Sequence, residues 1–187
     1  MKKFLFAVTI TAFLFSCNSE TKEATTTEDS TAVTTSDGDK KAAAELLDPS
    51  MAEGVKSSYL AFSKADIDGM TANYDENILY AWSAGDSLVG KKAVYDYWKK
   101  RWEIIESLNF TNQVVLPIQV NEPQVTTQRP GKYVLIWTLV DAKYKNGKTA
   151  RFMLHSVNHM NEAGKFDFIR MYYDRQPIYE VTKDLMK

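Results

Sequence analysis

Four β-prone runs follow one another in the second half of the chain, and they limit the possible folds more than any other feature. Residues 110–120, 133–142, 151–160 and 166–174 are rich in β-branched and aromatic side chains. Asn146-Gly147, between the second and third runs, is a strong hairpin signal, and a further turn is expected at residues 161–164. Runs joined by such short turns predict an antiparallel sheet. Pro117 lies inside the first run and predicts an edge strand or a bulge there.

Helical periodicity precedes these runs. The first segment places apolar residues three and four apart, at Met51, Val55, Tyr59 and Phe62. Asp48-Pro49 predicts the start of this helix, and Asp66 can cap a second, shorter one. A hairpin of residues 78–82 and 87–89 then leads to Gly90, which opens a third helix. The order predicts an α+β fold with helices on one side of a curved sheet.

The hairpin turn allows a prediction of the strand register. A two-residue Asn146-Gly147 loop places Thr138 opposite His155, and the next turn places His155 opposite Arg170. One face of the sheet then carries the polar side chains of Thr138, His155, Arg170, Tyr172 and Asp174. The other face carries Leu135, Trp137, Leu139 and Leu154, and is too apolar to face water. We expect a homodimer interface there, or cover by residues 178–186. A slip of one residue would exchange the two faces.

The N-terminus has the pattern of a secretory signal. Lys2 and Lys3 precede an apolar run that ends in Leu14-Phe15-Ser16-Cys17. This ending resembles the bacterial lipobox, in which the cysteine is acylated before cleavage. We therefore expect residues 1–16 to be a signal peptide and Cys17 to carry the lipid that attaches the protein to the membrane. The expected location is the bacterial cell envelope, at the outer membrane, facing either the periplasm or the cell surface.

Composition divides the rest of the chain. Residues 17–41 are mostly Thr, Ser, Glu, Asp and Lys, as expected of a disordered tether, which leaves residues 42–187 for one domain. Without residues 1–16 the chain has 21 basic and 24 acidic side chains, so a basic nucleic-acid footprint is not expected. Cys17 is the one cysteine of the sequence, so no intrachain disulfide can form.

Six short segments in a set order carry a family resemblance. They are Tyr59-Leu60-Ala61, Ala65-Asp66-Ile67-Asp68-Gly69-Met70, Tyr74-Asp75-Glu76-Asn77, Gly90-Lys91-Lys92-Ala93-Val94, Gly164-Lys165 and Tyr172-Tyr173-Asp174. Their order and spacing resemble the nuclear transport factor two-like superfamily, and within it the SnoaL-like and ketosteroid isomerase-like domains. The resemblance implies a cone-shaped, curved antiparallel sheet wrapped around N-terminal helices, the cystatin-like α+β roll. It also implies an apolar pocket inside the cone and, often, a dimer.

The isomerase branch implies roles for three residues. It places Tyr59 on the oxyanion tyrosine, His155 on the hydrogen-bonding acid and Trp82 on the general base. Tryptophan has no titratable proton acceptor, so it cannot abstract a proton from carbon, and the resemblance argues against isomerase chemistry. The residues expected to touch a ligand in the pocket are Tyr59, Trp82, Trp98, His155, Arg170 and Tyr172.

Three functions compete on this sequence. The leading hypothesis is a lipid-anchored domain that binds a small hydrophobic molecule without catalysis. The alternatives are a SnoaL-like cyclase, isomerase or hydrolase that uses His155 or Asp174 as acid or base, and an envelope module that binds a protein through its apolar sheet face. His155 and His159 would lie about 13 Å apart on one strand, too far to share a metal ion, so neither a metal nor a cofactor is expected.

Overall fold

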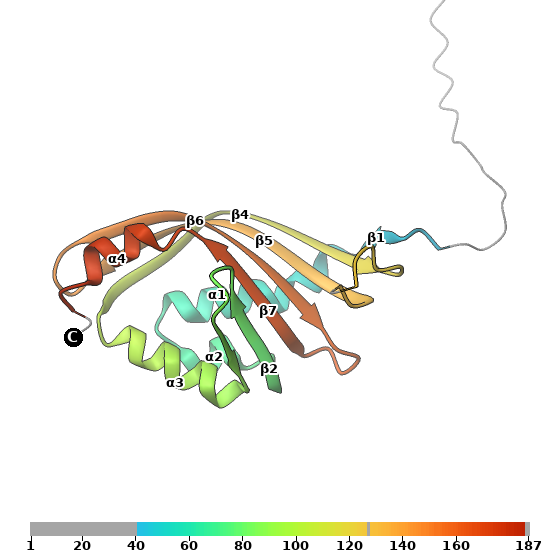
Figure 1. Cartoon of the computed structure of the whole chain (residues 1–187), viewed down its shortest axis with the longest axis horizontal. Helices are drawn as coiled ribbons and strands as arrows, with labels where there is room; N and C mark the ends of the chain where they lie inside the picture. Colours follow the sequence, from blue (N-terminus) through green and yellow to red (C-terminus); the bar gives the residue numbers. More distant parts are fainter. Residues whose placement is uncertain (1–40, 127, 186–187) are drawn as a thin grey trace, which may run out of the picture. The chain divides into compact units, whose positions relative to one another are not determined.

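The structure is a computed structural model that describes residues 41–126 and 128–185 (Figure 1). Asp39–Lys187 form a compact unit that contains the whole hydrophobic core. A unit with a core of its own is able to fold alone. The signal peptide predicted at residues 1–16, the lipidation predicted at Cys17, and the predicted tether up to residue 40 lie outside the described residues.

Helices and strands alternate in the first half of this unit, and long strands fill the second half. The helical elements are η1 (Pro49–Ala52), α1 (Glu53–Ser63), α2 (Ile67–Thr71), α3 (Lys91–Trp102) and α4 (Gln176–Thr182). The strands are β1 (Ala44–Leu46), β2 (Tyr74–Trp82), β3 (Ser87–Val89), β4 (Ile105–Val120), β5 (Gly131–Tyr144), β6 (Thr149–Met160) and β7 (Phe166–Tyr173). The predicted order of helices, small hairpin and long strands is confirmed.

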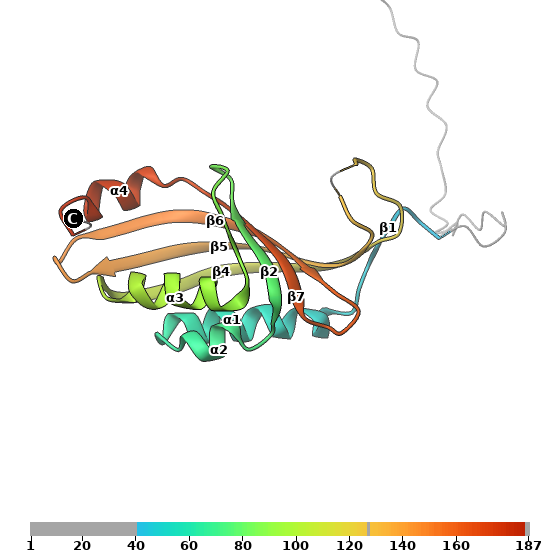
Figure 2. The ribbon, with the colours of Figure 1, turned by 60° about the horizontal axis from the view of Figure 1, so that its bottom comes forward.

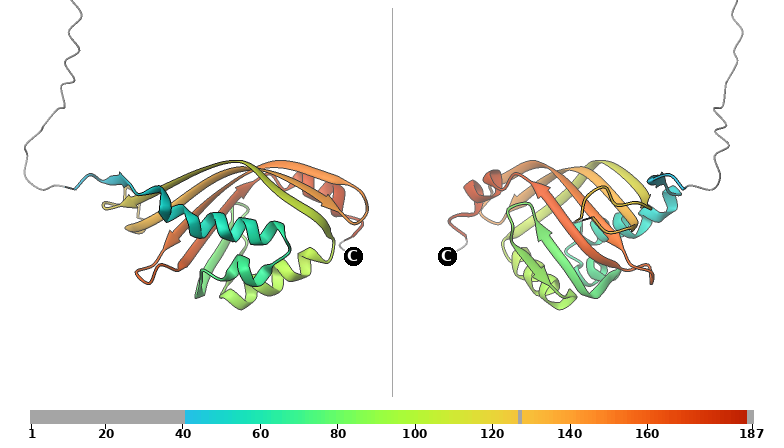
Figure 3. Two further views of the ribbon diagram at one scale, coloured as in Figure 1. Left: turned by 180° about the vertical axis from the view of Figure 1, so that it is seen from behind. Right: turned by 45° about the vertical axis from the view of Figure 1, so that its right-hand side comes forward.

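One curved sheet organises the unit. Its strand order is β1-β4-β5-β6-β7-β2-β3, and β4 to β7 arch over α1, α2 and α3 (Figures 1 and 3). The predicted α+β fold with helices on one side of a curved sheet is confirmed. The sheet is open and mixed, however, because β2 pairs with β7 in parallel while the other neighbours are antiparallel. The last helix, α4, lies at the end of the sheet near the β5–β6 turn, where Asn146 Nδ2 donates to the Val181 carbonyl over 2.8 Å (Figure 2).

Local side chain–backbone hydrogen bonds start the first two helical segments. Asp48 Oδ1 accepts from the Ser50 N–H over 2.8 Å, and Asp66 Oδ1 accepts from the Gly69 N–H over 2.8 Å. Each bond satisfies a backbone donor that the helix itself cannot pair. Both predicted starts are confirmed, since they depend only on residues within one turn.

Strand β4 contains a bulge, but not at the proline. The pairing of β4 with β5 is interrupted between Thr111 and Val114, where Asn112 has a φ of 51°. Pro117 pairs with Val134 in regular register, and its carbonyl accepts from the Leu47 N–H. The short strand β1 therefore pairs with this part of β4. The prediction that this strand lies at an edge or carries a bulge is confirmed by the irregularity between Thr111 and Val114, although the bulge does not lie at Pro117 itself.

The β5–β6 register differs by one residue from the prediction. Trp137 pairs with His155, and Thr138 with Leu154. The loop holds three residues, because Tyr144 N–H donates to the Lys148 carbonyl and Gly147 adopts a φ of 78°. A turn followed by a glycine in the left-handed region is the usual three-residue hairpin, whereas the prediction assumed a two-residue loop. The extra residue exchanges the faces of β5 and β6 relative to each other.

The β6–β7 register differs by two residues. His155 pairs with Tyr172, and Val157 with Arg170, instead of His155 with Arg170. A shift of two keeps side chains on their predicted common face. His155, Arg170 and Tyr172 therefore still share a face, but Thr138 does not lie on it.

Candidate functional site

An internal cavity of about 100 Å³ lies between the helices and the concave face of the sheet. Residues from α1, α2, α3, β2, β4, β5, β6, β7 and α4 line it. Its aromatic lining consists of Tyr59, Phe62, Tyr74, Tyr80, Tyr97, Trp98, Phe110, Tyr144, Phe152 and Tyr173. An engineered apolar cavity of about 150 Å³ holds benzene in another protein, so this space is of the order of a small ring compound.

Edge-to-face contacts hold the aromatic wall in place. The Phe62 ring meets the Trp98 ring edge-on at 4.7 Å between centroids, and Tyr59 meets Phe110 in the same way at 4.7 Å. Such contacts add about 0.5–1.5 kcal/mol beyond the burial of apolar area. The helical spacing of Tyr59 and Phe62 on α1 places both rings in the wall of the cavity.

A buried chain of polar groups supports Tyr59. Asn158 Nδ2 donates to the Val134 carbonyl over 2.8 Å and to Ser156 Oγ at 3.0 Å. Ser156 Oγ in turn lies 3.1 Å from the Tyr59 hydroxyl oxygen. If the Ser156 hydroxyl donates to Tyr59, the Tyr59 proton is left to donate to an acceptor in the cavity. This series of hydrogen bonds holds the Tyr59 phenol in place within an apolar wall.

Burial keeps the phenols of the cavity protonated. It raises the pKa of Tyr59, Tyr74 and Tyr80 far above the ordinary value of 10.0, and it raises the pKa of Tyr173 to about 12. A phenol that cannot ionise at neutral pH serves as a hydrogen-bond donor and not as a base. These groups can orient a ligand but cannot take a proton from it.

The mouth of the cavity is formed by its partly exposed lining residues. They include Tyr97 and Arg101 on α3, Ile104 between α3 and β4, and Ile178 on α4. Arg101 Nε donates to the Tyr97 hydroxyl over 3.1 Å, and its guanidinium lies 5.3 Å from the centre of the Tyr97 ring. The positively charged guanidinium of Arg101 therefore lies beside an aromatic side chain at the mouth of the cavity.

Two of the six predicted ligand-binding residues line the cavity. Tyr59 and Trp98 both do. Trp82 is buried behind the residues that line the cavity. Its ring packs against those of Tyr80 and Tyr97, at 5.0 and 5.2 Å between centroids. The indole N–H of Trp82 makes no hydrogen bond among the described residues, although it lies near the Tyr173 hydroxyl.

The other three, His155, Arg170 and Tyr172, lie on the convex face of the sheet. The expectation that they share the pocket with Tyr59 is wrong, because the three-residue loop turned His155 outward. The residue that meets Tyr59 from β6 is Ser156. His155 stacks instead between Trp137 at 4.6 Å and Tyr172 at 5.7 Å between ring centroids.

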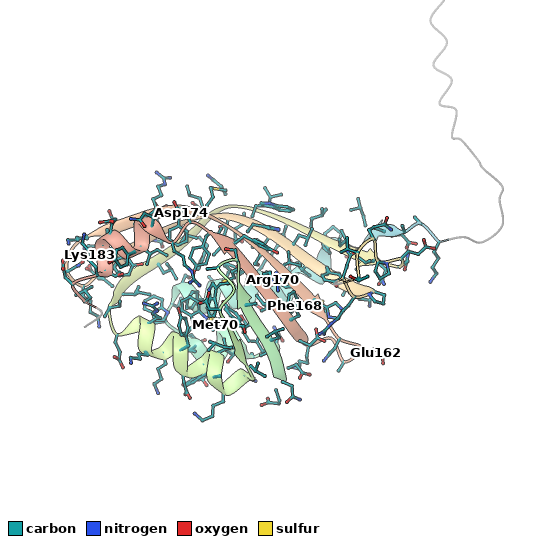
Figure 4. The ribbon with its side chains drawn as sticks, viewed as in Figure 1. Met70, Glu162, Phe168, Arg170, Asp174 and Lys183 are labelled. Carbon is teal, nitrogen blue, oxygen red and sulfur yellow. The ribbon has the colours of Figure 1, made fainter. Side chains whose placement is uncertain are left out.

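The candidate acid or base Asp174 also lies outside the cavity. It is exposed at the end of β7, where its Oδ1 accepts from the Gln176 N–H over 2.9 Å. Figure 4 labels Phe168, Arg170 and Asp174 along this strand, and Met70, a lining residue, beneath the sheet. The Arg170 guanidinium lies over the Phe168 ring at 5.4 Å. The expected polar network of His155, Arg170 and Asp174 in the cone is therefore absent from the described lining.

The convex face carries exposed apolar side chains beside His155 and Arg170, and the C-terminal helix does not cover it. Its exposed side chains include Val114, Trp137, Met153 and Tyr172, with 61, 36, 58 and 41 % of their surface accessible. The last helix, α4, instead places Ile178 and Thr182 in the wall of the cavity. The expectation that residues 178–186 cover the convex face is wrong for the described part, and the alternative of a homodimer interface stays a prediction.

Most of the lining residues were not predicted as site residues from the sequence, among them Arg101, Tyr97, Tyr144 and Tyr173. Arg101 shares a helix face with Trp98. An arginine on an otherwise apolar helix face is the sequence feature that could have identified it as a lining residue. In residues 41–126 and 128–185, no three His, Cys, Asp or Glu side chains gather as metal ligands. None of the helices among these residues is both long and apolar enough to cross a membrane.

Comparison with known proteins identifies a family to which the chain belongs. The family model described as "SnoaL-like domain" matches residues 55–167. No curated protein matches the chain significantly.

Solved structures with the same fold are numerous. One is a Bacillus subtilis protein proposed to be an isomerase, with a TM-score of 0.56 and 20 % identity over 71 % of this chain and 92 % of that one. Another is a Xanthomonas campestris pv. campestris protein proposed to be a polyketide cyclase, with a TM-score of 0.55 and 19 % identity over 67 % and 91 %. A third is TerC co-crystallised with polyporic acid, with a TM-score of 0.54 and 14 % identity over 71 % and 98 %. At these identities the likeness concerns the fold.

Proposed function

Since the chain belongs to the SnoaL-like domain family of the nuclear transport factor two-like superfamily, we propose that it binds a small apolar, ring-containing molecule in its cavity without chemical conversion. One observation carries the proposal: the cavity is walled by aromatic and aliphatic side chains, and its described lining contains neither a carboxylate nor an imidazole. Pockets of this kind hold ligands by shape and burial, and a few polar groups set the orientation.

The available polar groups support binding over catalysis. A general base must accept a proton near neutral pH, and burial raises the pKa values of Tyr59, Tyr74 and Tyr80 too far for that role. Trp82, at the position that the isomerase resemblance gives to the base, is 3 % exposed and walled in by other aromatic rings. The cavity can therefore retain a molecule but offers no group to deprotonate it.

A cyclase, isomerase or hydrolase remains the second candidate, and two solved structures of the same fold are proposed to be an isomerase and a polyketide cyclase. It would have to use His155 or Asp174, as the sequence reasoning proposed. Both lie on or beyond the convex face, away from the apolar cavity. An enzyme built on them would need a second site on that face.

We further propose that the domain is attached to the envelope membrane through an acylated Cys17 and pairs with a second copy through its convex face. An exposed apolar patch of this kind is typical of interaction surfaces. Replacement of Trp137 by Arg is expected to give a monomer in light scattering, whereas Leu60→Arg, at an apolar residue on α1 that is 58 % exposed, is expected to leave the dimer intact. If the wild type is a monomer, the face would instead fit a different protein partner.

The test of ligand binding uses the compact unit Asp39–Lys187 with a neutral probe. We expect native mass spectrometry to find a co-purified small molecule, and equilibrium dialysis to show uptake of benzamide, a single-ring compound that suits the size of the cavity. The variant Ala142→Leu adds three carbon atoms to a buried lining residue and should abolish uptake. The control Ala163→Leu makes the same change at an exposed turn residue and should bind like the wild type.

Two results would contradict the proposal. A wild type that neither carries a molecule nor takes up the probe would indicate that the cavity is a packing defect. Equal uptake by the Ala142→Leu and Ala163→Leu variants would place the probe elsewhere on the surface. Thermal unfolding of each variant checks that the fold is retained.

A further inference from the structure

The convex face of the sheet has a regular arrangement of side chains around its stacked rings. Trp137, His155 and Tyr172 lie in register across β5, β6 and β7, at 4.6 and 5.7 Å between neighbouring ring centroids. We call these three residues the ring row. Residues two positions away on a strand share its face, and here they form a row on either side: Leu135, Val157 and Arg170 on one, and Leu139, Met153 and Asp174 on the other. Each flanking row therefore has two aliphatic side chains and one charged side chain, and the two charges are opposite.

Arg170 and Asp174 form no ion pair with any of residues 41–126 and 128–185. Arg170 is exposed, and its guanidinium lies over the Phe168 ring at 5.4 Å from the centroid. Asp174 is exposed at the end of β7, where its Oδ1 accepts from the Gln176 N–H. Figure 4 labels both side chains along this strand. Four residues of a strand span about 13 Å, so the two charges stand apart and each can pair with a group on another molecule.

We infer that two copies of the chain pack convex face to convex face about a two-fold axis along the ring row, so that Arg170 of each copy pairs with Asp174 of the other. This inference rests on the proposed dimer and names its arrangement and the residues that select it. Rotation about this axis returns the ring row to itself and exchanges the two flanking rows. Aliphatic side chains then meet aliphatic side chains, as Leu135 meets Leu139, and each charge meets an opposite charge.

The other two-fold arrangement of the same faces conflicts with these charges. An axis along β6 through His155 exchanges β5 with β7. Arg170 then lies against Leu135 of the other copy. Asp174 lies against Leu139 in the same way. A charge that is buried against an aliphatic side chain loses its hydration and gains no partner, which costs free energy. Because complementary charges fix the register of an interface, the axis along the ring row is the favoured one.

The test reverses the two charges one at a time and measures the dissociation constant of the dimer by sedimentation velocity, with the unit Asp39–Lys187. Arg170→Asp and Asp174→Arg each put two pairs of like charges into the dimer, so each should weaken it by about tenfold or more. Lys145→Asp makes the same change of charge at an exposed turn residue and should dimerise like the wild type. Thermal unfolding of each variant checks that the fold is retained.

A mixture of the two single variants tests the pairing between copies directly. In a dimer of one Arg170→Asp chain and one Asp174→Arg chain, both contacts between positions 170 and 174 again join opposite charges. We expect this mixture to form dimers about as tight as those of the wild type, and the double variant to dimerise by itself in the same way. The control mixture combines Arg170→Asp with Glu162→Arg, which adds the same positive charge at an exposed turn residue, and it should not restore tight pairing of the Arg170→Asp chain.

The outcomes separate the arrangement from the dimer on which it rests. If the wild type is a dimer but the two single variants stay monomeric when mixed, the inference is wrong while the dimer stands. The same holds if the single variants dimerise like the wild type. If Glu162→Arg restores pairing as fully as Asp174→Arg does, the effect is one of net charge, and the inference is also wrong. If the wild type itself is a monomer, the proposed dimer fails as well, whereas uptake of benzamide by the cavity is measured independently of both.

Discussion

The buried phenols make the unit unstable in alkali, and the size of the effect follows from the structure. Tyr59, Tyr74 and Tyr80 are 7, 6 and 1 % exposed, and burial raises their pKa values far above 10.0. In the unfolded chain they ionise near pH 10, while in the folded state they stay protonated. The unfolded state therefore binds fewer protons above pH 10, and stability falls as the pH rises. Below pH 10 these groups leave stability unchanged.

Stability falls steeply with rising pH because several buried phenols contribute to the loss together. Each contributes about 1.4 kcal/mol per pH unit above pH 10, so three phenols remove about 4 kcal/mol by pH 11. Domains of this size have a stability of about 5–15 kcal/mol. We therefore expect cooperative unfolding between about pH 11 and 12.

The assay follows tyrosinate absorbance and circular dichroism together along a pH titration. The buried phenols should ionise only as the helix and sheet signals are lost. Because Tyr173, with a pKa raised to about 12, also contributes, Tyr74→Phe should reduce the slope of unfolding free energy against pH by about a quarter at most. Tyr179→Phe, at a side chain that is 55 % exposed, is the control and should leave the slope unchanged. Tyrosinate absorbance that rises smoothly to completion near pH 10, with the fold retained, would refute the reasoning.

Three further predictions concern stability. Tyr59→Phe and Ser156→Ala should show a coupling of about 1 kcal/mol in a double-mutant cycle of urea unfolding, and strictly additive effects would mean that the 3.1 Å contact contributes nothing. Gly131→Ala should cost about 1–3 kcal/mol, because its φ is +134° and a Cβ there would lie 2.6 Å from Nε2 of His159; an unchanged melting temperature would contradict this. Gly147→Ala should cost less, about 1 kcal/mol, since its φ is +78° but nothing lies within 4 Å, and a larger loss than at Gly131 would reverse the argument.

Features that depend on neighbouring residues could be predicted from the sequence. The caps at Asp48 and Asp66 follow from hydrogen bonds two or three residues long. The helical spacing of Tyr59 and Phe62 likewise placed both in the wall of the cavity. The order of the helices, the small hairpin and the long strands predicted the α+β fold with a curved sheet, and the family resemblance added the apolar pocket.

Features that depend on distant contacts could not be predicted. The choice between a two- and a three-residue loop at Asn146-Gly147 rests on small local differences, and it decided whether His155 or Ser156 faces Tyr59. The parallel pairing of β2 with β7 joins strands about 90 residues apart. No pattern in the sequence predicts that β2 pairs with β7.

The position of α4 bears on how the ligand preference of a domain with this fold can evolve. Ile178 and Thr182 come from this one short helix and line one side of the cavity, while most of the other lining residues come from the sheet and the earlier helices. Substitutions in α4 can therefore change what the cavity admits while the curved sheet stays intact. Selection for a new ligand has in α4 a part of the wall that can vary without any change in strand pairing.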